Sequence, residues 1–141
     1  MYAHFNVQSV LNSHFRFVSA RNPGDLLGCH GHFTSVAYKL RLTRLRSVRA
    51  TDEFLAWLEG LRDVRARAKV LSRLDRLELG NPGDVAPIGA GVSEMRIHHG
   101  PGYRIYYVRQ SDDFVILCGG DKSSQKQDSE LAKRLAKEPE D

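Results

Sequence analysis

The pattern of apolar and polar positions becomes regular only after residue 50. Phe54, Leu58 and Leu61 recur at helical spacing behind Thr51, a residue type favoured at the N-cap of a helix. The two acidic residues after Thr51 place negative charge in the first turn, where the helix dipole favours it. The pattern therefore predicts an amphipathic helix that ends near Arg62.

A second apolar stripe follows Asp63, another candidate N-cap. Val70, Leu74 and Leu77 repeat at helical spacing, and the stretch 80–82, Gly-Asn-Pro, ends the helix. Because the link between the two helices is short, we expect them to form an antiparallel helical hairpin.

Three short segments of strand character follow a loop rich in Gly and Pro at residues 80–92. Turn sequences at residues 100–102 and 110–113 separate them, so the strands should be antiparallel neighbours. The predicted strands are Ser93–His99, Tyr103–Arg109 and Phe114–Cys118. Gly119 and Gly120 are expected to end the third strand.

A final helix is predicted after Ser123 or Ser124, either of which can cap it. Its apolar face carries Leu131, Ala132, Leu135 and Ala136. The order of elements predicts an α+β fold, with an N-terminal helical hairpin packed on a small antiparallel sheet and followed by a C-terminal helix.

The boundaries of the folded domain follow from the same patterning. Residues 41–50 alternate loosely and are expected to supply one edge strand, so the domain should span residues 43–137, with an acidic tail at 138–141. Residues 1–40 show no sustained period, and residues 1–42 form an N-terminal extension. They are interpreted as a flexible basic arm or an extension that the fold does not need, with an ordered extra hairpin as the less favoured alternative.

Composition excludes several classes of protein. The chain has 141 residues, of which 41% are apolar and 27% charged, as in a single globular domain. No stretch approaches the roughly 18 consecutive apolar residues of a membrane span, and the first twenty residues lack the apolar core of a secretory signal. The two cysteines fit a reducing cytosol. We therefore expect a cytoplasmic protein.

The net charge of +4 conceals an asymmetry. Residues 1–50 carry seven bases and one acid, whereas residues 51–141 carry fourteen bases and sixteen acids. The bulk charge is therefore weak evidence for binding to nucleic acid, and any such activity must come from a local arrangement of bases.

One face of the predicted hairpin carries candidate chemistry. If residues 100–102 form the loop, His99 lies opposite Tyr103 and His98 lies opposite Arg104. Side chains alternate between the faces, so one face is apolar and covers the helices, while the other points to the opposite surface. The residues on that second face are Arg96, His98, Arg104 and Tyr106.

These residue types match what RNA cleavage by its own 2′-hydroxyl requires. Two arginines can stabilise a charged phosphorane, and His98 can act as base or acid near neutral pH. Tyr106 could stack on a base or donate a proton, and Lys122 could add a cation at the rim. The alternative is an ordinary solvent-facing strand surface, on which such side chains are common.

Two further groups are open to both a functional and a structural interpretation. The basic residues of the second helix could rest on RNA phosphates or form a solvated face: Arg65, Lys69, Arg73 and Arg76. Cys29, His30 and His32 look like part of a metal site but lack a second pair at usable spacing. We therefore predict no metal and no cofactor.

Residues 51–136 resemble the RelE/ParE superfamily of bacterial toxins, closest to its phage Gp49-like or HigB-like branch of addiction module killer proteins. The resemblance rests on Thr51-Asp52-Glu53-Phe54, on Glu94-Met95-Arg96-Ile97 with Gly100-Pro101-Gly102-Tyr103-Arg104-Ile105-Tyr106-Tyr107, and on Gly119-Gly120-Asp121-Lys122-Ser123-Ser124-Gln125. It implies a bacterial type II toxin that cleaves mRNA on the ribosome without a metal. The implied partner is a small antitoxin, often of helix-turn-helix type. The toxin would contact operator DNA only through this antitoxin.

The resemblance also assigns positions. Arg104 matches the strand arginine that contacts the scissile phosphate, Lys122 matches a basic position after the last core strand, and Arg96 matches a basic position on the preceding strand. Residues 1–42 have no counterpart and could be an upstream-start extension. No tyrosine follows Tyr107, so the last helix lacks the tyrosine that some RelE-type nucleases use.

Two other functions compete with the nuclease. One is a ParE-like poison that binds DNA gyrase and performs no chemistry. The other is an inactive toxin fold that serves only as antitoxin partner and operon corepressor.

Overall fold

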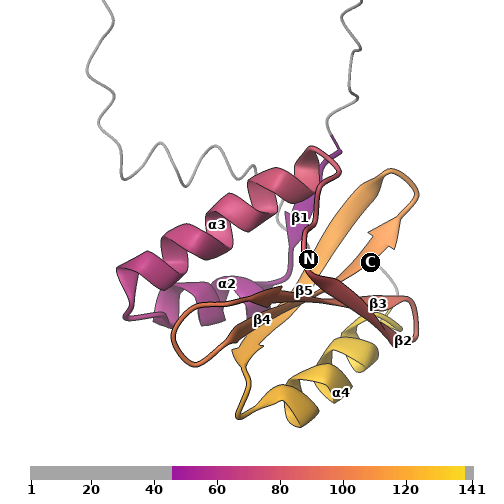
Figure 1. The fold of residues 1–141 in the computed structure, drawn as a ribbon. Coiled ribbons are helices and arrows are strands. Elements are labelled where there is room, and N and C mark those ends of the chain that lie inside the picture. The colour runs from indigo at the N-terminus through magenta and orange to yellow at the C-terminus, as the bar shows by residue number, and fades with distance from the viewer. Residues whose placement is uncertain (1–45, 139–141) are drawn as a thin grey trace, which may run out of the picture.

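A single five-stranded sheet organises the computed structural model, which describes residues 46–138 (Figure 1). The sheet order is β1-β5-β4-β3-β2; β1 runs parallel to β5 and the other neighbours are antiparallel. In chain order the elements are β1 (Val48–Ala50), α2 (Asp52–Gly60), α3 (Val64–Glu78), β2 (Val85–Gly89), β3 (Val92–Ile97), β4 (Tyr103–Gln110), β5 (Asp113–Asp121) and α4 (Gln125–Leu135). The predicted α+β class is confirmed, but the sheet is mixed instead of antiparallel because β1 pairs with β5 in parallel.

Helices cover both faces of the sheet (Figure 1). Helices α2 and α3 pack on one face around Phe54, Leu74 and Ile105, all at most 2% exposed. Helix α4 packs on the other face, where Ala132 is buried with Leu117. The molecule therefore has three layers, and the predicted helical stripes face the sheet, with Leu61, Leu131 and Ala136 only partly buried.

Both predicted N-caps of the first two helices are formed. The Thr51 hydroxyl accepts a hydrogen bond from Phe54 N at 3.2 Å and donates to the Leu117 carbonyl of β5. The Asp63 carboxylate accepts from Arg65 N and Ala66 N. Such caps satisfy donors that have no partner within the helix. The Thr51 cap also joins the start of α2 to the sheet.

Three features of the predicted order are corrected. The expected edge strand is β1, which precedes both helices, so the helices connect β1 to β2 instead of preceding the whole sheet. Strand β2 lies in the predicted loop; it tolerates Pro87 because it is an edge strand with one side unpaired. Strand β5 does not end at Cys118 but continues through Gly119 and Gly120 to Asp121.

The predicted register of the β3–β4 hairpin is also wrong. Arg96 pairs with Arg104, and Ile97 pairs with Tyr103, so residues 98–102 form the loop. The slip moves each residue of β3 to a partner two residues nearer the loop on β4. Because side chains alternate with a period of two, the assignment of residues to faces survives this slip.

Several predictions lie outside the described residues. These are the extension 1–42, the metal-like fragment Cys29–His32 and the tail beyond residue 138. Within residues 46–138, no helix is long and apolar enough to cross a bilayer.

Candidate functional site at the end of the β3–β4 hairpin

Arg96, Arg104 and Tyr106 converge on a buried carboxylate that sequence reasoning assigned no role. The side chain of Glu94 is 1% exposed. Its Oε1 lies 3.0 Å from Arg96 Nε and 3.4 Å from Arg104 Nε. The first contact is a hydrogen bond, whereas the second is an ion pair without a well-directed hydrogen bond, since the buried Arg104 Nε has no hydrogen-bond acceptor among the described residues.

The other oxygen of Glu94 binds two neutral donors. Oε2 accepts from the Tyr106 hydroxyl at 3.2 Å and from Gln125 Nε2, at the start of α4, at 2.9 Å. Burial acts to raise the pKa of Glu94, but the bonds from Arg96 and Gln125 and the charge of Arg104 hold it below its ordinary value. Glu94 is therefore a buried anion at neutral pH.

Tyr106 does not fill the role predicted for it. The residue is fully buried, because α4 covers this part of the face. Burial is the main cause that raises the pKa of its hydroxyl above the ordinary value, and the negative charge of Glu94 is the second. It cannot stack on a base or meet solvent in this arrangement, and its hydroxyl instead supports Glu94.

Arg104 and Lys122 both lie beside Gly102 of the hairpin loop. Arg104 Nη1 donates to the Gly102 carbonyl at 3.1 Å, and its side chain is 13% exposed. A Cβ on Gly102 would lie 3.8 Å from Arg104 Nη1 and 3.9 Å from Lys122 Cβ. The two predicted cationic residues therefore flank the same turn, while Lys122 itself is exposed.

His98 lies in the hairpin loop, just beyond the end of β3, and not on the strand as predicted. Its Nε2 lies 2.7 Å from Asp84 Oδ2, and its side chain is 79% exposed. Because a carboxylate only accepts hydrogen bonds, this contact places the proton of a neutral imidazole on Nε2 and leaves Nδ1 as the basic nitrogen. Asp84 also lies 3.8 Å from Arg96 Nη1, so it links the histidine to the arginine.

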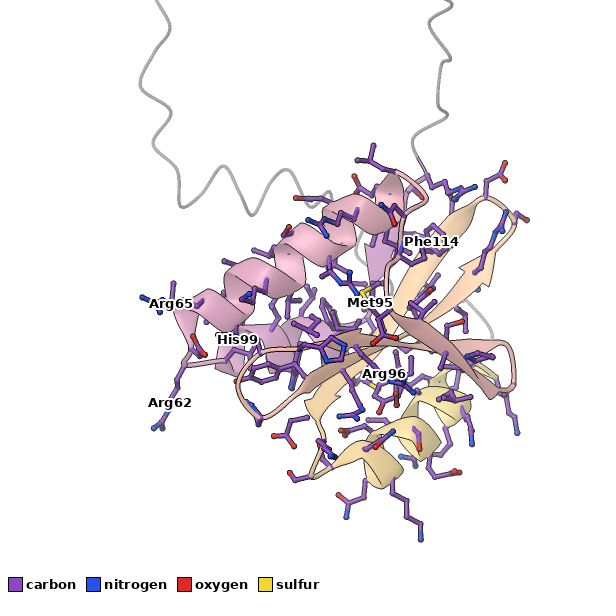
Figure 2. The ribbon with its side chains drawn as sticks, viewed as in Figure 1. Arg62, Arg65, Met95, Arg96, His99 and Phe114 are labelled. Atoms are coloured by element: carbon purple, nitrogen blue, oxygen red, sulfur yellow. The ribbon has the colours of Figure 1, made fainter. Side chains whose placement is uncertain are left out.

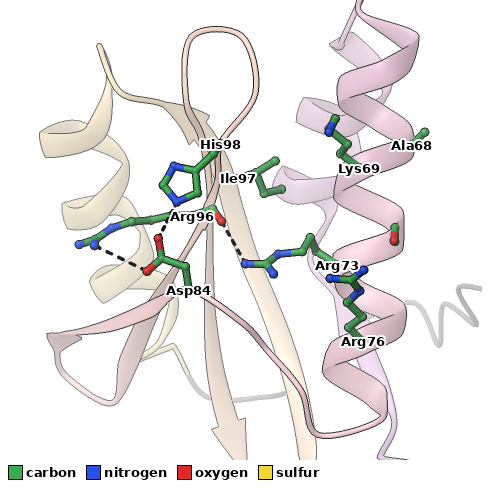
Figure 3. A pocket seen from close by; sticks show the side chains of 9 residues that line it. Ala68, Lys69, Arg73, Arg76, Asp84, Arg96, Ile97 and His98 are labelled. Atoms are coloured by element: carbon green, nitrogen blue, oxygen red, sulfur yellow. Dashed lines mark hydrogen bonds and ion pairs between the residues drawn. The ribbon is translucent and has the colours of Figure 1, made fainter.

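A cavity of about 470 Å³ lies between α3 and the end of β3 (Figure 3). His98, Arg96 and Asp84 line one side of it, and the basic stripe of α3 lines the other. Its lining residues are Ala68, Lys69, Ser72, Arg73, Arg76, Asp84, Arg96, Ile97 and His98. Two predicted catalytic residues and three predicted RNA-binding residues thus line one cavity, although the Arg96 guanidinium extends away from α3 (Figure 3).

The predicted RNA-binding residues of α3 divide into three kinds. Lys69 and Arg76 line the cavity. Arg73 also lines it, but Arg73 Nη2 donates to the Arg96 carbonyl at 3.1 Å and its guanidinium lies over Gly83, so it holds α3 to the sheet (Figure 3). Arg65 lies at the first turn of α3 and does not line the cavity (Figure 2).

Sequence reasoning missed Glu94, Asp84 and Gln125. Glu94 carried one available signal, since it alternates with Arg96 and belongs to the polar face of β3. Asp84 and Gln125 come from β2's flank and from α4, and only the fold brings them near. Within residues 46–138, no group of three potential metal-ligating side chains lies close enough together to hold an ion.

The comparisons with known proteins cover this whole site. The family model described as "Phage derived protein Gp49-like (DUF891)" matches residues 56–138, more than half of the chain and every predicted site residue. An uncharacterised protein of Haemophilus influenzae (strain ATCC 51907 / DSM 11121 / KW20 / Rd) is 46% identical over 92 residues, which are 64% of this chain and 93% of that protein. No solved structure matches. The chain belongs to the phage-derived Gp49-like family, a toxin-like family.

Proposed function

We propose that this protein is the toxin of a type II toxin–antitoxin system and a ribosome-dependent mRNA endoribonuclease of the RelE/ParE superfamily and its HigB-like branch, acting in the bacterial cytoplasm. The observation that carries the proposal is the position of His98 between two groups of cations. It lines the cavity across from Lys69 and Arg76, and Asp84 links it to Arg96, whose side chain extends away from α3 toward Glu94 (Figure 3). Cations around a cavity next to a titratable imidazole are the groups that phosphodiester cleavage needs.

The chemistry proceeds by attack of the RNA's own 2′-hydroxyl. His98 Nδ1 takes the 2′ proton, the 2′ oxygen bonds to phosphorus, and the bond from phosphorus to the 5′ oxygen breaks. The 5′ oxygen takes a proton from water as it leaves, so the products are a 2′,3′-cyclic phosphate and a 5′-hydroxyl, and the proton held by His98 returns to solvent. Arg96, Arg104 and Lys122 stabilise the negative charge that builds on the phosphoryl oxygens. These steps use the side chains of this chain and water.

The partners follow from the same proposal. The ribosome presents the mRNA, and a cognate antitoxin of helix-turn-helix type holds the toxin inactive and carries it to operator DNA. Lys69 and Arg76 bind phosphates next to the cleaved one, which accounts for basic residues on a helix face that the core does not need.

The experiment is cleavage of a defined mRNA in a purified translation system, with and without ribosomes. Arg104→Ala should slow cleavage by roughly 10²–10³-fold, as expected when one donor to the charged transition state is lost. Arg109→Ala is the matched control, since Arg109 is an exposed arginine on the same strand. Ribosome-dependent cuts that end in a cyclic phosphate, lost in the Arg104 variant alone, would support the proposal.

An intact mRNA after incubation with folded wild-type protein would overturn the nuclease. Inhibition of gyrase supercoiling would then favour a ParE-like poison. If the mRNA stays intact and gyrase stays active, while the protein binds the antitoxin tightly, the result would favour a corepressor without chemistry.

A further inference from the structure

The two arginines of the site lie directly opposite each other on neighbouring strands. Arg96 on β3 and Arg104 on β4 are register partners, and both side chains lie on the α4 face. Like charges directly opposite on neighbouring strands destabilise a sheet, so this pair needs a counter-charge. Glu94, two residues before Arg96 on the same face, supplies it.

Both carboxylate oxygens of Glu94 interact with neighbouring side chains, four in all. One oxygen faces the Nε atoms of both arginines, and the other accepts from Tyr106 and Gln125. With three hydrogen bonds, one further ion pair and only 1% of its side chain exposed, the carboxylate is not placed to take a proton from RNA. It acts on the arginines instead.

We propose that Glu94 is a positioning residue that fixes Arg96 and Arg104 as a preorganised pair for one RNA phosphate; this inference rests on the proposed nuclease function. Glu94 accepts a hydrogen bond from Arg96 Nε and forms an ion pair with Arg104 Nε, while Arg104 Nη1 is held by the Gly102 carbonyl. Glu94 thus draws the two guanidinium groups to one point of the sheet. A fixed pair of donors stabilises a transition state better than two mobile ones, because no reorganisation is needed when the charge develops.

Helix α4 is part of this device. Gln125, the first residue of α4, donates to Glu94, and the Tyr106 hydroxyl lies 3.5 Å from the Gln125 carbonyl. The position of α4 therefore sets the position of Glu94 and, through it, the arginine pair. This accounts for a buried carboxylate on a face that apolar residues could otherwise fill.

Glu94→Gln tests the inference, because it keeps the shape and removes the charge. Single-turnover cleavage at saturating ribosome–mRNA complex should slow by roughly 10²-fold, the scale of a misplaced catalytic group, while half-saturation changes less than threefold. Glu130→Gln is the control: Glu130 forms an exposed ion pair with Lys133 on α4, so its loss should leave cleavage unchanged.

A second readout follows the arginines themselves. In nitrogen-15 spectra of the side chains, the Nε–H signals of Arg96 and Arg104, assigned with lysine variants, should be well dispersed in wild type and collapse toward free arginine in Glu94→Gln. Unchanged signals, wild-type cleavage by Glu94→Gln, or a loss that merely tracks the folded fraction would each overturn the inference.

Two further arms keep the outcome decisive. If Glu94→Gln does not fold, Gln125→Leu removes one donor to Glu94 at a half-buried position and should slow cleavage by about tenfold; wild-type cleavage by that variant would overturn the inference. If wild-type protein cuts no RNA, the nuclease proposal fails, whereas the spectra still decide whether Glu94 holds the arginines.

Discussion

The two faces of the sheet are built from the same alternating strands but are stabilised differently. Toward α2 and α3, the strands present apolar side chains such as Met95 and Ile105, both 0% exposed. Toward α4, the face is apolar around Leu117 but ends in the buried charge of Glu94 and the two arginines of the hairpin. One face is a core throughout, and the other changes from core to site along its length.

The difference shows how the molecule separates stability from chemistry. An apolar core tolerates substitutions that keep its volume, because dispersion and burial are not directional. A buried carboxylate is stable only when its oxygens keep all of their donors. We therefore expect the α2/α3 face to supply most of the stability and the α4 face to supply the precision of the site.

Truncating one apolar residue on each face gives the largest expected effects. Phe54→Ala on α2 should reduce the free energy of unfolding by about 3–5 kcal/mol, because the ring is 1% exposed within the larger core. Leu135→Ala on the last turn of α4 should cost about 2 kcal/mol, since that side chain is 8% exposed. Urea unfolding measures both. Equal losses would contradict the assignment of stability to the α2/α3 face.

Two adjacent glycines of β5 separate the faces further. A Cβ at Gly119 would overlap the ring of Trp57 on α2, whereas a Cβ at Gly120 would overlap Asp128 on α4. Each change to alanine should destabilise by about 1–3 kcal/mol through overpacking. Because Trp57 is the single tryptophan, its fluorescence should shift in Gly119→Ala and stay unchanged in Gly120→Ala. A shift in both variants would mean that the two faces respond as one.

These glycines also mark where prediction of the fold from sequence stops. Helical periodicity and caps predict α2 and α3 because those signals are local. In the sequence, Gly119 and Gly120 instead indicate the end of a strand. Their lack of a side chain is explained only by the packing of Trp57 and Asp128 from either side of the sheet, which the sequence does not show. Strand β2 was missed for a similar reason: Pro87 is acceptable only at a sheet edge, and edges are set by the topology.

The site shows the same limit. Alternation along β3 and β4 placed Arg96, Arg104 and Tyr106 on one face correctly, because a slip of the register by an even step preserves the faces. It could not show that α4 buries Tyr106, nor that His98 leaves the strand to meet Asp84. Local periodicity determines which face a residue points to, and long-range packing determines what lies above it.

The cavity edge, where the two faces meet, offers a smaller contrast between Arg73 and Lys69. Arg73→Ala removes a charge-assisted hydrogen bond to the Arg96 carbonyl and should lower the free energy of unfolding by about 1–2 kcal/mol. Lys69→Ala should leave stability within about 0.5 kcal/mol, but should lower the slope of log affinity for single-stranded RNA against log salt by about 0.7.

Urea unfolding and RNA titrations at four salt concentrations measure this pair of effects. An unchanged salt slope for Lys69→Ala would remove Lys69 from the RNA-binding surface. A stability loss equal to that of Arg73→Ala would make both residues structural.

The smallest expected effect is a pH dependence at the link between the hairpin loop and α3. His99 Nε2 lies 2.9 Å from Asp63 Oδ2, on the α2/α3 side of the sheet. The backbone N–H of Ala66, and after it His99, hold the pKa of Asp63 below the ordinary value of 3.8. A lowered carboxyl pKa stabilises the fold above the pKa of the unfolded chain, and the contribution is lost as the pH falls through the lower folded value.

Asp63→Asn isolates this contribution, because asparagine caps a helix as well as aspartate does but does not titrate. The stability of wild type relative to Asp63→Asn should be constant from pH 7 to about pH 5 and decrease below about pH 4, as measured by urea unfolding at each pH. Asp52→Asn, at an exposed position in the first turn of α2, is the control. If the stability of wild type relative to Asp63→Asn instead increased as the pH fell, the carboxylate of Asp63 would be destabilising in the fold. Packing of His99, and not its contact with the carboxylate, would then connect the hairpin loop to α3.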